Sequence, residues 1–270
     1  MLCDLGKFFN NNLCCNFSLE RNVIRSRFQR YIELVENKYK GHDEVSCAKS
    51  LIGLIVEYLN YKEAVEAVEI DSCPEDNSSL YSIYSQLEEK LDLQSALIAV
   101  EEVHKDDEKA YKNAVLLNRP SIEVSVNAVP ILLSPWKGER TIDNLIVINS
   151  ENVFDGVKYS FNIENWYLHP MGIVVCKGGN HSQLSARYKN KGITIINRVI
   201  DFTQLYKTVE FNGNSYVKID DGTVVDLESS ENILFYSGVI FELGRYLTGK
   251  NYCSVKEIST ILNDGNEYTV

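Results

Sequence analysis

The spacing of apolar residues changes near residue 120, and this change constrains the fold more than any other feature of the sequence. Before it, apolar side chains recur every three or four residues in windows such as 19–35, 45–59 and 80–91, which is typical of amphipathic helices. The same spacing predicts two more helices, at 92–103 and 107–117. We therefore expect a helical N-terminal region over residues 1–120.

Beyond residue 120 the chain is rich in Val, Ile and Tyr, and turn residues interrupt it often. The segments 122–133 and 145–148 favour strands, and Asn212-Gly213 between two apolar runs predicts a hairpin. A long apolar helix is expected at 232–247, with Ser230 as its N-cap. The predicted fold class is α+β, with the helical N-terminal region followed by a mixed α/β domain over residues 121–270.

Composition and charge limit the classes of partner. The chain has 270 residues and a formal net charge of −11 at pH 7, whereas a protein that binds duplex DNA needs a surface that neutralises phosphates, so nucleic acid is not favoured. No apolar run is long enough to span a membrane. The seven cysteines are scattered without a Cys-x-x-Cys pair, which is typical of reduced thiols and gives no zinc-ligand spacing. We therefore expect a cytoplasmic protein without membrane contact or a zinc site.

The stretch that suggests chemistry most directly is Lys177-Gly178-Gly179-Asn180-His181-Ser182. A strand-like run, 172–176, precedes it, and a helix-like run, 183–191, follows it and stops at Gly192. Glycines let the backbone approach a phosphate closely, and the N–H groups of a first helical turn supply donors and the positive end of the helix dipole. We therefore predict a nucleotide- or phosphate-binding loop.

This loop allows two interpretations. In the functional one, the N–H groups from Gly179 to Ser182 hold a phosphate, and His181 either hydrogen-bonds it or acts as an acid–base catalyst, because the pKa of histidine lies near neutrality. In the structural one, the glycines form a tight turn, Asn180 is the N-cap and His181 packs in the first turn. The strand before the loop and the helix after it favour the functional interpretation.

Two segments carry a resemblance to a known family. The first, 126–140, is a strand followed by a Pro-containing loop that ends in Arg140, and the second, 169–186, places Pro170 before an apolar strand, the Gly-Gly-Asn-His-Ser loop and a helix. Together they resemble the ParB/sulfiredoxin-like fold, over about residues 121–206. The resemblance implies that fold for this part of the chain and a phosphate-binding role for its loop. It also suggests a bacterial protein from a mobile-element or phage-defence setting.

Two positions depart from the loop of that family. Asn180 stands where sulfiredoxins have a cysteine, so repair of a sulfinic acid is not expected. Ser182 stands where an arginine is usual, which removes one phosphate contact. Arg187 or Lys177 could substitute for that arginine.

The first of the two segments adds charged candidates. Arg140 could clamp a phosphate bidentately, and Glu139 could serve as a base or as a magnesium ligand. Both could equally belong to a solvated loop in which Trp136 packs against the domain. His169, before the apolar strand, either faces the same pocket or is a loop residue with a satisfied hydrogen bond. Asp201, at the end of the following strand, either reaches the site or caps the turn at 202–206.

The function expected from these residues is the binding of a nucleotide or a phosphorylated small molecule. ATP or another nucleotide with magnesium is the implied cofactor, and the reaction would be that of an NTP hydrolase, a phosphotransferase or a nuclease, with His181 and Glu139 as catalytic residues. The alternative is a non-catalytic interaction module with a decayed nucleotide site, whose helical N-terminal region binds a protein partner. A DNA-binding regulator is a third candidate, which the negative charge disfavours.

Overall fold

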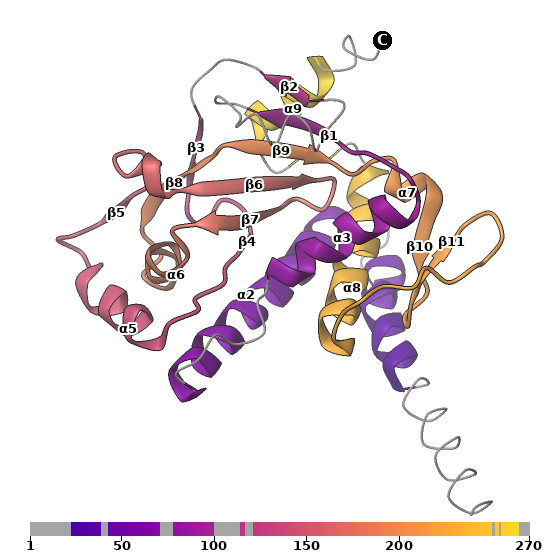
Figure 1. The fold of residues 1–270 in the computed structure, drawn as a ribbon, viewed down its shortest axis with the longest axis horizontal. Coiled ribbons are helices and arrows are strands. Elements are labelled where there is room, and N and C mark those ends of the chain that lie inside the picture. Colours follow the sequence, from indigo (N-terminus) through magenta and orange to yellow (C-terminus); the bar gives the residue numbers. More distant parts are fainter. Residues whose placement is uncertain are drawn as a thin grey trace, which may run out of the picture.

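The computed structural model describes residues 23–38, 43–70, 78–99, 114–116, 121–249, 252–253 and 255–264 (Figure 1). Its helical elements are the segment 23–33, which continues into the π-helix η1 (Leu34–Lys38), then α2 (Glu44–Ile70), α3 (Ser78–Lys90), α5 (Gly138–Val147), the 3-10 helix η2 (Ser160–Asn162), α6 (Asn180–Tyr188), α7 (Leu205–Thr208), α8 (Glu231–Thr248) and α9 (Lys256–Asp264). Its strands are β1 (Ala96–Ala99), β2 (Ala114–Leu116), β3 (Ile122–Ser125), β4 (Ile131–Leu132), β5 (Phe154–Asp155), β6 (Glu164–His169), β7 (Ile173–Gly178), β8 (Gly192–Ile196), β9 (Arg198–Asp201), β10 (Val209–Phe211) and β11 (Tyr216–Lys218). Helices dominate the N-terminal part and most strands follow residue 120, so the predicted α+β class is confirmed.

The main sheet has six strands in the order β2-β1-β9-β6-β7-β4. Its central strand β6 pairs with β7 in antiparallel and with β9 in parallel orientation, so Trp166 lies opposite Val175 on one side and Arg198 on the other. A smaller sheet, β3-β8-β5, lies beside α6, and β10 and β11 form a separate hairpin. The six-stranded sheet therefore mixes both orientations, as expected for an α+β protein.

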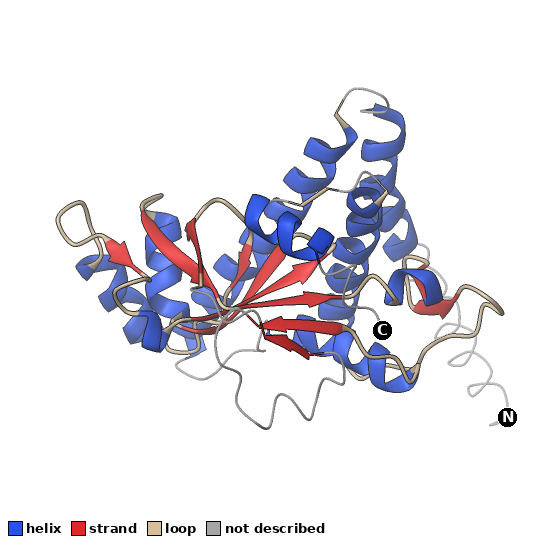
Figure 2. Ribbon diagram, turned by 90° about the horizontal axis from the view of Figure 1, so that it is seen from above, coloured by secondary structure: helices blue, strands red, loops and turns tan. Residues whose placement is uncertain are grey.

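Successive side chains of the six-stranded sheet enter two different cores, because strand residues alternate between faces. Leu97 and Leu168 lie in the core shared with α2, α3 and α8. Their neighbours Ile98 and Tyr167 lie in a second core with Leu184 of α6 and with α9. Helices therefore cover both faces of this sheet (Figure 2).

Two of the expected helices are strands. The window 92–103 contains β1, and the described part of 107–117 is β2. β1 pairs with β2 and with β9, and Leu97 and Ile98 are buried on opposite faces. A run of four apolar residues is compatible with a helix or with a strand. Here the run forms a strand because β9 supplies hydrogen-bond partners for its backbone. The residues before and after position 120 therefore share one sheet and, through α2 and α3, one core.

The predicted strand at 145–148 is also wrong, because these residues close α5. Gly138 and Thr141 are the buried positions of α5, three residues apart, as expected for one face of a helix. A Cβ atom on Gly138 would lie 2.7 Å from Ala67 O, so α5 approaches the backbone of α2 very closely. This contact positions the start of α5, which borders the candidate site.

The apolar helix α8 agrees with its prediction. Ser230 caps it, accepting a hydrogen bond from Ile233 N over 3.4 Å. The hairpin is confirmed as well, with Gly213 at φ +93° between β10 and β11. Most residues of α8, including Phe241, are buried in the core. In the described part of the chain, no helix is apolar over a length that could cross a membrane.

Candidate functional site

The turn between β7 and α6 is the centre of the candidate site. β7 ends at Gly178, and Gly179 turns the chain with a φ of +84° before α6 begins at Asn180. A Cβ atom on Gly179 would lie 2.5 Å from Ile163 Cδ1, so that side chain would have to move, and the positive φ itself favours glycine. The predicted order of strand, paired glycines and helix is confirmed.

Among the described residues, no side chain caps the N-terminus of α6. Gln183 N donates to Gly179 O over 3.0 Å, so the N–H groups of Asn180, His181 and Ser182 form the uncapped first turn. Asn180, the N-cap in the structural interpretation, is instead the first helical residue. This turn therefore presents the positive end of the helix dipole.

Two side chains of the turn fasten it to the connection between β4 and α5 and to α5 itself. Asn180 Oδ1 accepts a hydrogen bond from Ser134 N over 2.8 Å. Ser182 Oγ donates one to Asn144 Oδ1 over 2.9 Å. The side chains of Asn180 and Ser182 therefore position the turn, and their backbone N–H groups are the parts suited to an anion.

His181 joins the N-termini of two helices. Its Nε2 accepts a hydrogen bond from Lys137 N over 3.3 Å, and Lys137 is the N-cap residue of α5, which likewise has no side-chain cap within the described residues. Because Nε2 is the acceptor, the proton of the neutral imidazole is assigned to Nδ1. The His181 side chain is thus a buried donor where two uncapped helix N-termini meet.

Trp136 and Arg140 border His181. The Trp136 ring is 46% exposed, and its centroid lies 5.6 Å from that of His181 in an edge-to-face arrangement. The guanidinium carbon of Arg140 lies 5.3 Å from the Trp136 ring. Burial, followed by the charge of Arg140, lowers the pKa of His181 below its usual 6.5. Arg140 therefore supplies the positive charge here at neutral pH, and Trp136 offers a partly exposed aromatic ring.

Two of the expected phosphate ligands lie elsewhere. Lys177 Nζ lies 4.8 Å from the ring of Tyr81, on the side of the sheet covered by α3. Arg187 is in the last turn of α6, where it pairs with Glu57 of α2 and donates to Val129 O over 2.9 Å. The structure does not bring either cation to the start of α6, so neither replaces the arginine that Ser182 lacks.

Glu139 lies in the first turn of α5 with its side chain 76% exposed. Its carboxylate lies 3.7 Å from Lys137 Nζ, and an exposed pair of this kind contributes about 1 kcal/mol or less to stability. In the part of the chain that the structure describes, no three His, Cys, Asp or Glu side chains come together to hold a metal. Glu139 is therefore at the rim of the candidate site, next to Arg140, and contacts Lys137 rather than His181.

His169 and Asp201 lie at the other end of the sheet. They end β6 and β9 and face each other in the parallel pair, whereas Gly178 pairs with Glu164 at the start of β6. The length of β6 therefore separates them from the glycine turn by about 17 Å, at about 3.3 Å per residue. Asp201 Oδ1 accepts a hydrogen bond from Thr203 N over 2.9 Å, so this carboxylate caps the turn that follows β9. These two residues are not part of the candidate site.

A buried polar network holds the glycine turn, and no pattern in the sequence predicts it. Gln183 Nε2 donates to Gly178 O and to Asn165 Oδ1, each over 3.1 Å. Asn165 Nδ2 donates to Thr194 Oγ1 over 2.9 Å and to Ile195 O over 2.7 Å. Asn165, Gln183 and Thr194 are fully buried. Amide and hydroxyl side chains are ordinarily found at the surface, so only the fold shows that these position the loop.

The lowered pKa of His181 predicts a pH effect on stability. The unfolded chain takes up a proton near pH 6.5, whereas folded His181 takes one up only at lower pH, so stability is lost as the pH falls from 6.5 towards the folded pKa. In His181→Gln protein this loss should be smaller. Urea unfolding at several pH values, from neutral to mildly acidic, measures this loss of stability. Burial also lowers the pKa of His169, so His169 accounts for the pH dependence that remains in the His181→Gln protein. Equal slopes in both proteins would contradict the assignment of a buried, neutral His181.

Comparison with known proteins gives one family. The model of a family of unknown function, DUF6710, matches residues 16–254, which include every element of the candidate site. No curated protein matches the chain, and no solved structure matches it. The family match spans both the helical N-terminal region and the sheets. The chain therefore belongs to the DUF6710 family of unknown function.

Proposed function

We propose that the protein binds a nucleotide or another phosphorylated ligand where α5 and α6 begin. The observation that carries this proposal is the meeting of two uncapped helix N-termini at His181, with Arg140 alongside. Helix N-termini favour anions because their N–H groups and dipoles point outward, and an arginine adds a charge with fork geometry. The ligand would accept hydrogen bonds from the first turn of α6 and from Nδ1 of His181.

The bonding of His181 favours binding over acid–base catalysis. Nε2 already accepts the Lys137 N–H, so the imidazole cannot accept a proton there without losing that hydrogen bond. Glu139 lies at the rim and pairs with Lys137. Hydrolysis, phosphoryl transfer or nuclease chemistry would therefore rest on Glu139 and on a magnesium ion brought by the nucleotide.

Trp136 supports a nucleotide over a smaller phosphorylated ligand. An exposed indole beside a phosphate site can stack on a base, and such stacking contributes about 1–3 kcal/mol per base. We further propose a ParB/sulfiredoxin-like fold for residues 121–206. The order β4, α5, then β6, β7, α6 and β8, with β5 and η2 between α5 and β6, supports it. The first resembling segment covers β4 and the start of α5, and the second runs from the end of β6 through β7 into α6.

The test is binding of fluorescent ATP, ADP and AMP, followed by fluorescence anisotropy. Arg140→Gln and His181→Ala should each weaken binding at least about tenfold, which corresponds to about 1.4 kcal/mol. Lys189→Gln is the matched control, because it removes an exposed cation at the opposite end of α6 and should leave the affinity unchanged. The proposal fails if wild-type protein binds none of the three nucleotides, or if Arg140→Gln binds as tightly as wild type.

A second candidate function is a non-catalytic interaction module. It is favoured by the hydrogen bonds that occupy the Asn180 and Ser182 side chains and by the distant positions of Lys177 and Arg187. On this reading the loop is a structural turn with no ligand. Wild-type protein that binds neither nucleotide nor pyrophosphate, with the Gly179 turn intact, is the result that would support it.

A further inference from the structure

α2 carries a partly exposed apolar stripe on the face opposite its buried one, and within it the Tyr58 ring also contacts Tyr236 of α8, with centroids 5.5 Å apart. Its members are spaced alternately by four and three residues, and each is between 43% and 66% exposed: Leu54, Tyr58, Tyr61, Val65 and Val68. The opposite face of α2, with Ile52 and Leu59, is buried in the main core. Alternating spacings of four and three are those of a seam between two packed helices. The helix is therefore apolar on two faces, and the described structure buries only one of them.

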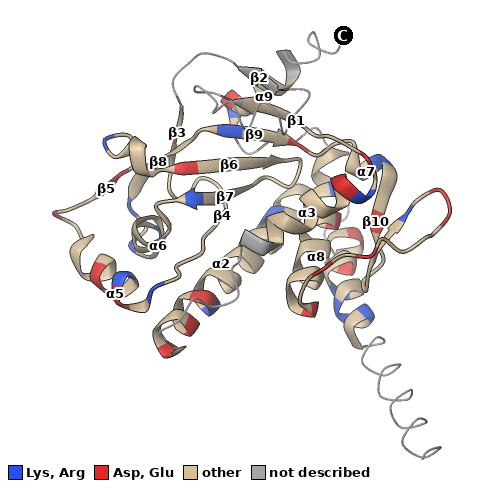
Figure 3. Cartoon of the chain, viewed as in Figure 1, with Lys and Arg blue, Asp and Glu red and all other residues tan. Residues whose placement is uncertain are grey.

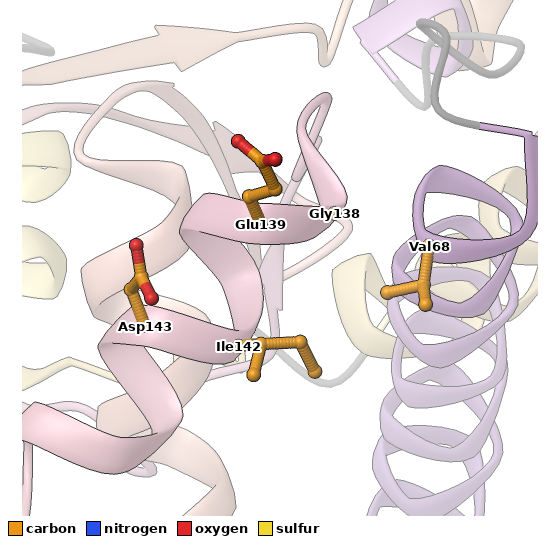
Figure 4. A pocket seen from close by; sticks show the side chains of 5 residues that line it. All are labelled: Val68, Gly138, Glu139, Ile142 and Asp143. Atoms are coloured by element: carbon orange, nitrogen blue, oxygen red, sulfur yellow. The ribbon is translucent and has the colours of Figure 1, made fainter.

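The stripe leads into a hollow between α2 and α5. A pocket of about 550 Å³ is lined by Val68 of α2 and by Gly138, Glu139, Ile142 and Asp143 of α5. Figure 4 shows Val68 and Ile142 on the two sides of this hollow, with Glu139 and Asp143 on the same side of α5. Ile142 is 44% exposed. The close approach at Gly138 fixes the distance between the helices, so the hollow is a formed part of the fold.

The rim of this groove is acidic. Glu139 and Asp143 line the pocket, and Glu69 is exposed beside Val68. The nearby cations are Lys137 and Lys62, which pair with Glu139 and Glu66 respectively, and Arg140, whose guanidinium lies over the Trp136 ring. Figure 3 marks acidic positions on α5 and at the adjoining end of α2, with basic positions among them. Negative charge therefore exceeds positive charge around an apolar floor.

We infer that this groove, formed by the α2 stripe and the α5 rim, docks an amphipathic helix with basic flanks from a partner protein. The apolar face of such a helix would cover the stripe, with one large side chain in the hollow at Val68 and Ile142. Lysines or arginines on its flanks would face Glu139 and Asp143. A second copy of the chain fits less well, because a symmetric pair would place acidic rims together and each copy has a net charge of −11. This inference does not depend on phosphate binding.

The experiment uses two labelled synthetic helical peptides with the same stripe of leucines, one flanked by lysines and the other by glutamates. Fluorescence anisotropy with full-length protein should give at least about tenfold tighter binding of the lysine peptide, and added salt should reduce this preference. Val65→Ser combined with Val68→Ser should weaken binding at least about tenfold. Glu139→Lys combined with Asp143→Lys should remove the preference for the lysine peptide. Phe161→Ser is the matched control, because it removes an 87% exposed aromatic residue outside the groove.

Three results would overturn the inference. The first is saturable binding of neither peptide, and the second is equal binding of both. The third is a wild-type dimer in light scattering that the Val65 and Val68 substitutions convert to monomer, which would assign the stripe to a second copy. The charge-reversed variant tests the inference separately if the serine variant does not fold.

Discussion

Replacing Phe241 by alanine should lower the free energy of unfolding by about 3–5 kcal/mol. Phe241 is fully buried in α8, and its ring stacks on Tyr206 with centroids 4.0 Å apart. Its ring also packs near those of Tyr84 of α3 and Tyr216 of β11, with centroids 6.1 Å and 5.4 Å away respectively. The truncation would leave a cavity among three aromatic rings from separate elements, which cannot all move in to fill it. Urea unfolding followed by circular dichroism measures the change.

Phe161→Ala is the control for this substitution. The Phe161 side chain is 87% exposed, so its loss should change stability by no more than about 0.5 kcal/mol. Similar effects of the two substitutions would show that Phe241 does not hold α3, α8 and β11 together. A Phe241→Leu variant should recover most of the lost stability, because it refills much of the cavity.

Replacing Asn165 by leucine should cost about 2–4 kcal/mol, although leucine is more apolar and similar in size. The amide of Asn165 donates to Ile195 O and Thr194 Oγ1 and accepts a hydrogen bond from Gln183 Nε2. Without it, these buried polar groups lose partners in a region that water does not reach, and each unsatisfied group costs about 1–3 kcal/mol. Unfolding by urea gives the magnitude.

The same substitution also tests the link from this network to the loop. Gln183 holds Gly178 O, so a displaced Gln183 should loosen the glycine turn and weaken nucleotide binding in protein that is still folded. Asn214→Leu is the matched control, because Asn214 lies in an exposed turn and its replacement should change stability by about 0.5 kcal/mol or less. A stable Asn165→Leu protein would contradict the assignment of the network as a support of the site.

Local features of the site could be predicted because their causes lie within a few residues. Gly179 adopts a φ that favours glycine, and Ser230 caps the helix that begins after it. The sequence predicts Arg140 as a phosphate ligand from its own segment, and in the structure its charge acts on His181. The sequence also predicts Lys177 and Arg187 as phosphate ligands, but in the structure both side chains point away from the start of α6. The direction of each side chain depends on the strand or helix face that it occupies, which the sequence alone does not show. Arg187 points to Glu57, which lies 130 residues earlier in the chain.

The sequence by itself determined the α+β class, the glycine turn, the hairpin and the capped helix α8, because spacing, φ preference and capping act over short distances. Only the tertiary structure decided that the apolar run 96–99 is a strand, since its hydrogen-bond partners come from β9, about 100 residues later. Only the tertiary structure brought His181, Lys137 and Arg140 together and buried the Asn165 network behind them. Backbone pairing and side-chain partners across such distances are set by how the elements pack, and no local pattern of residues specifies that packing.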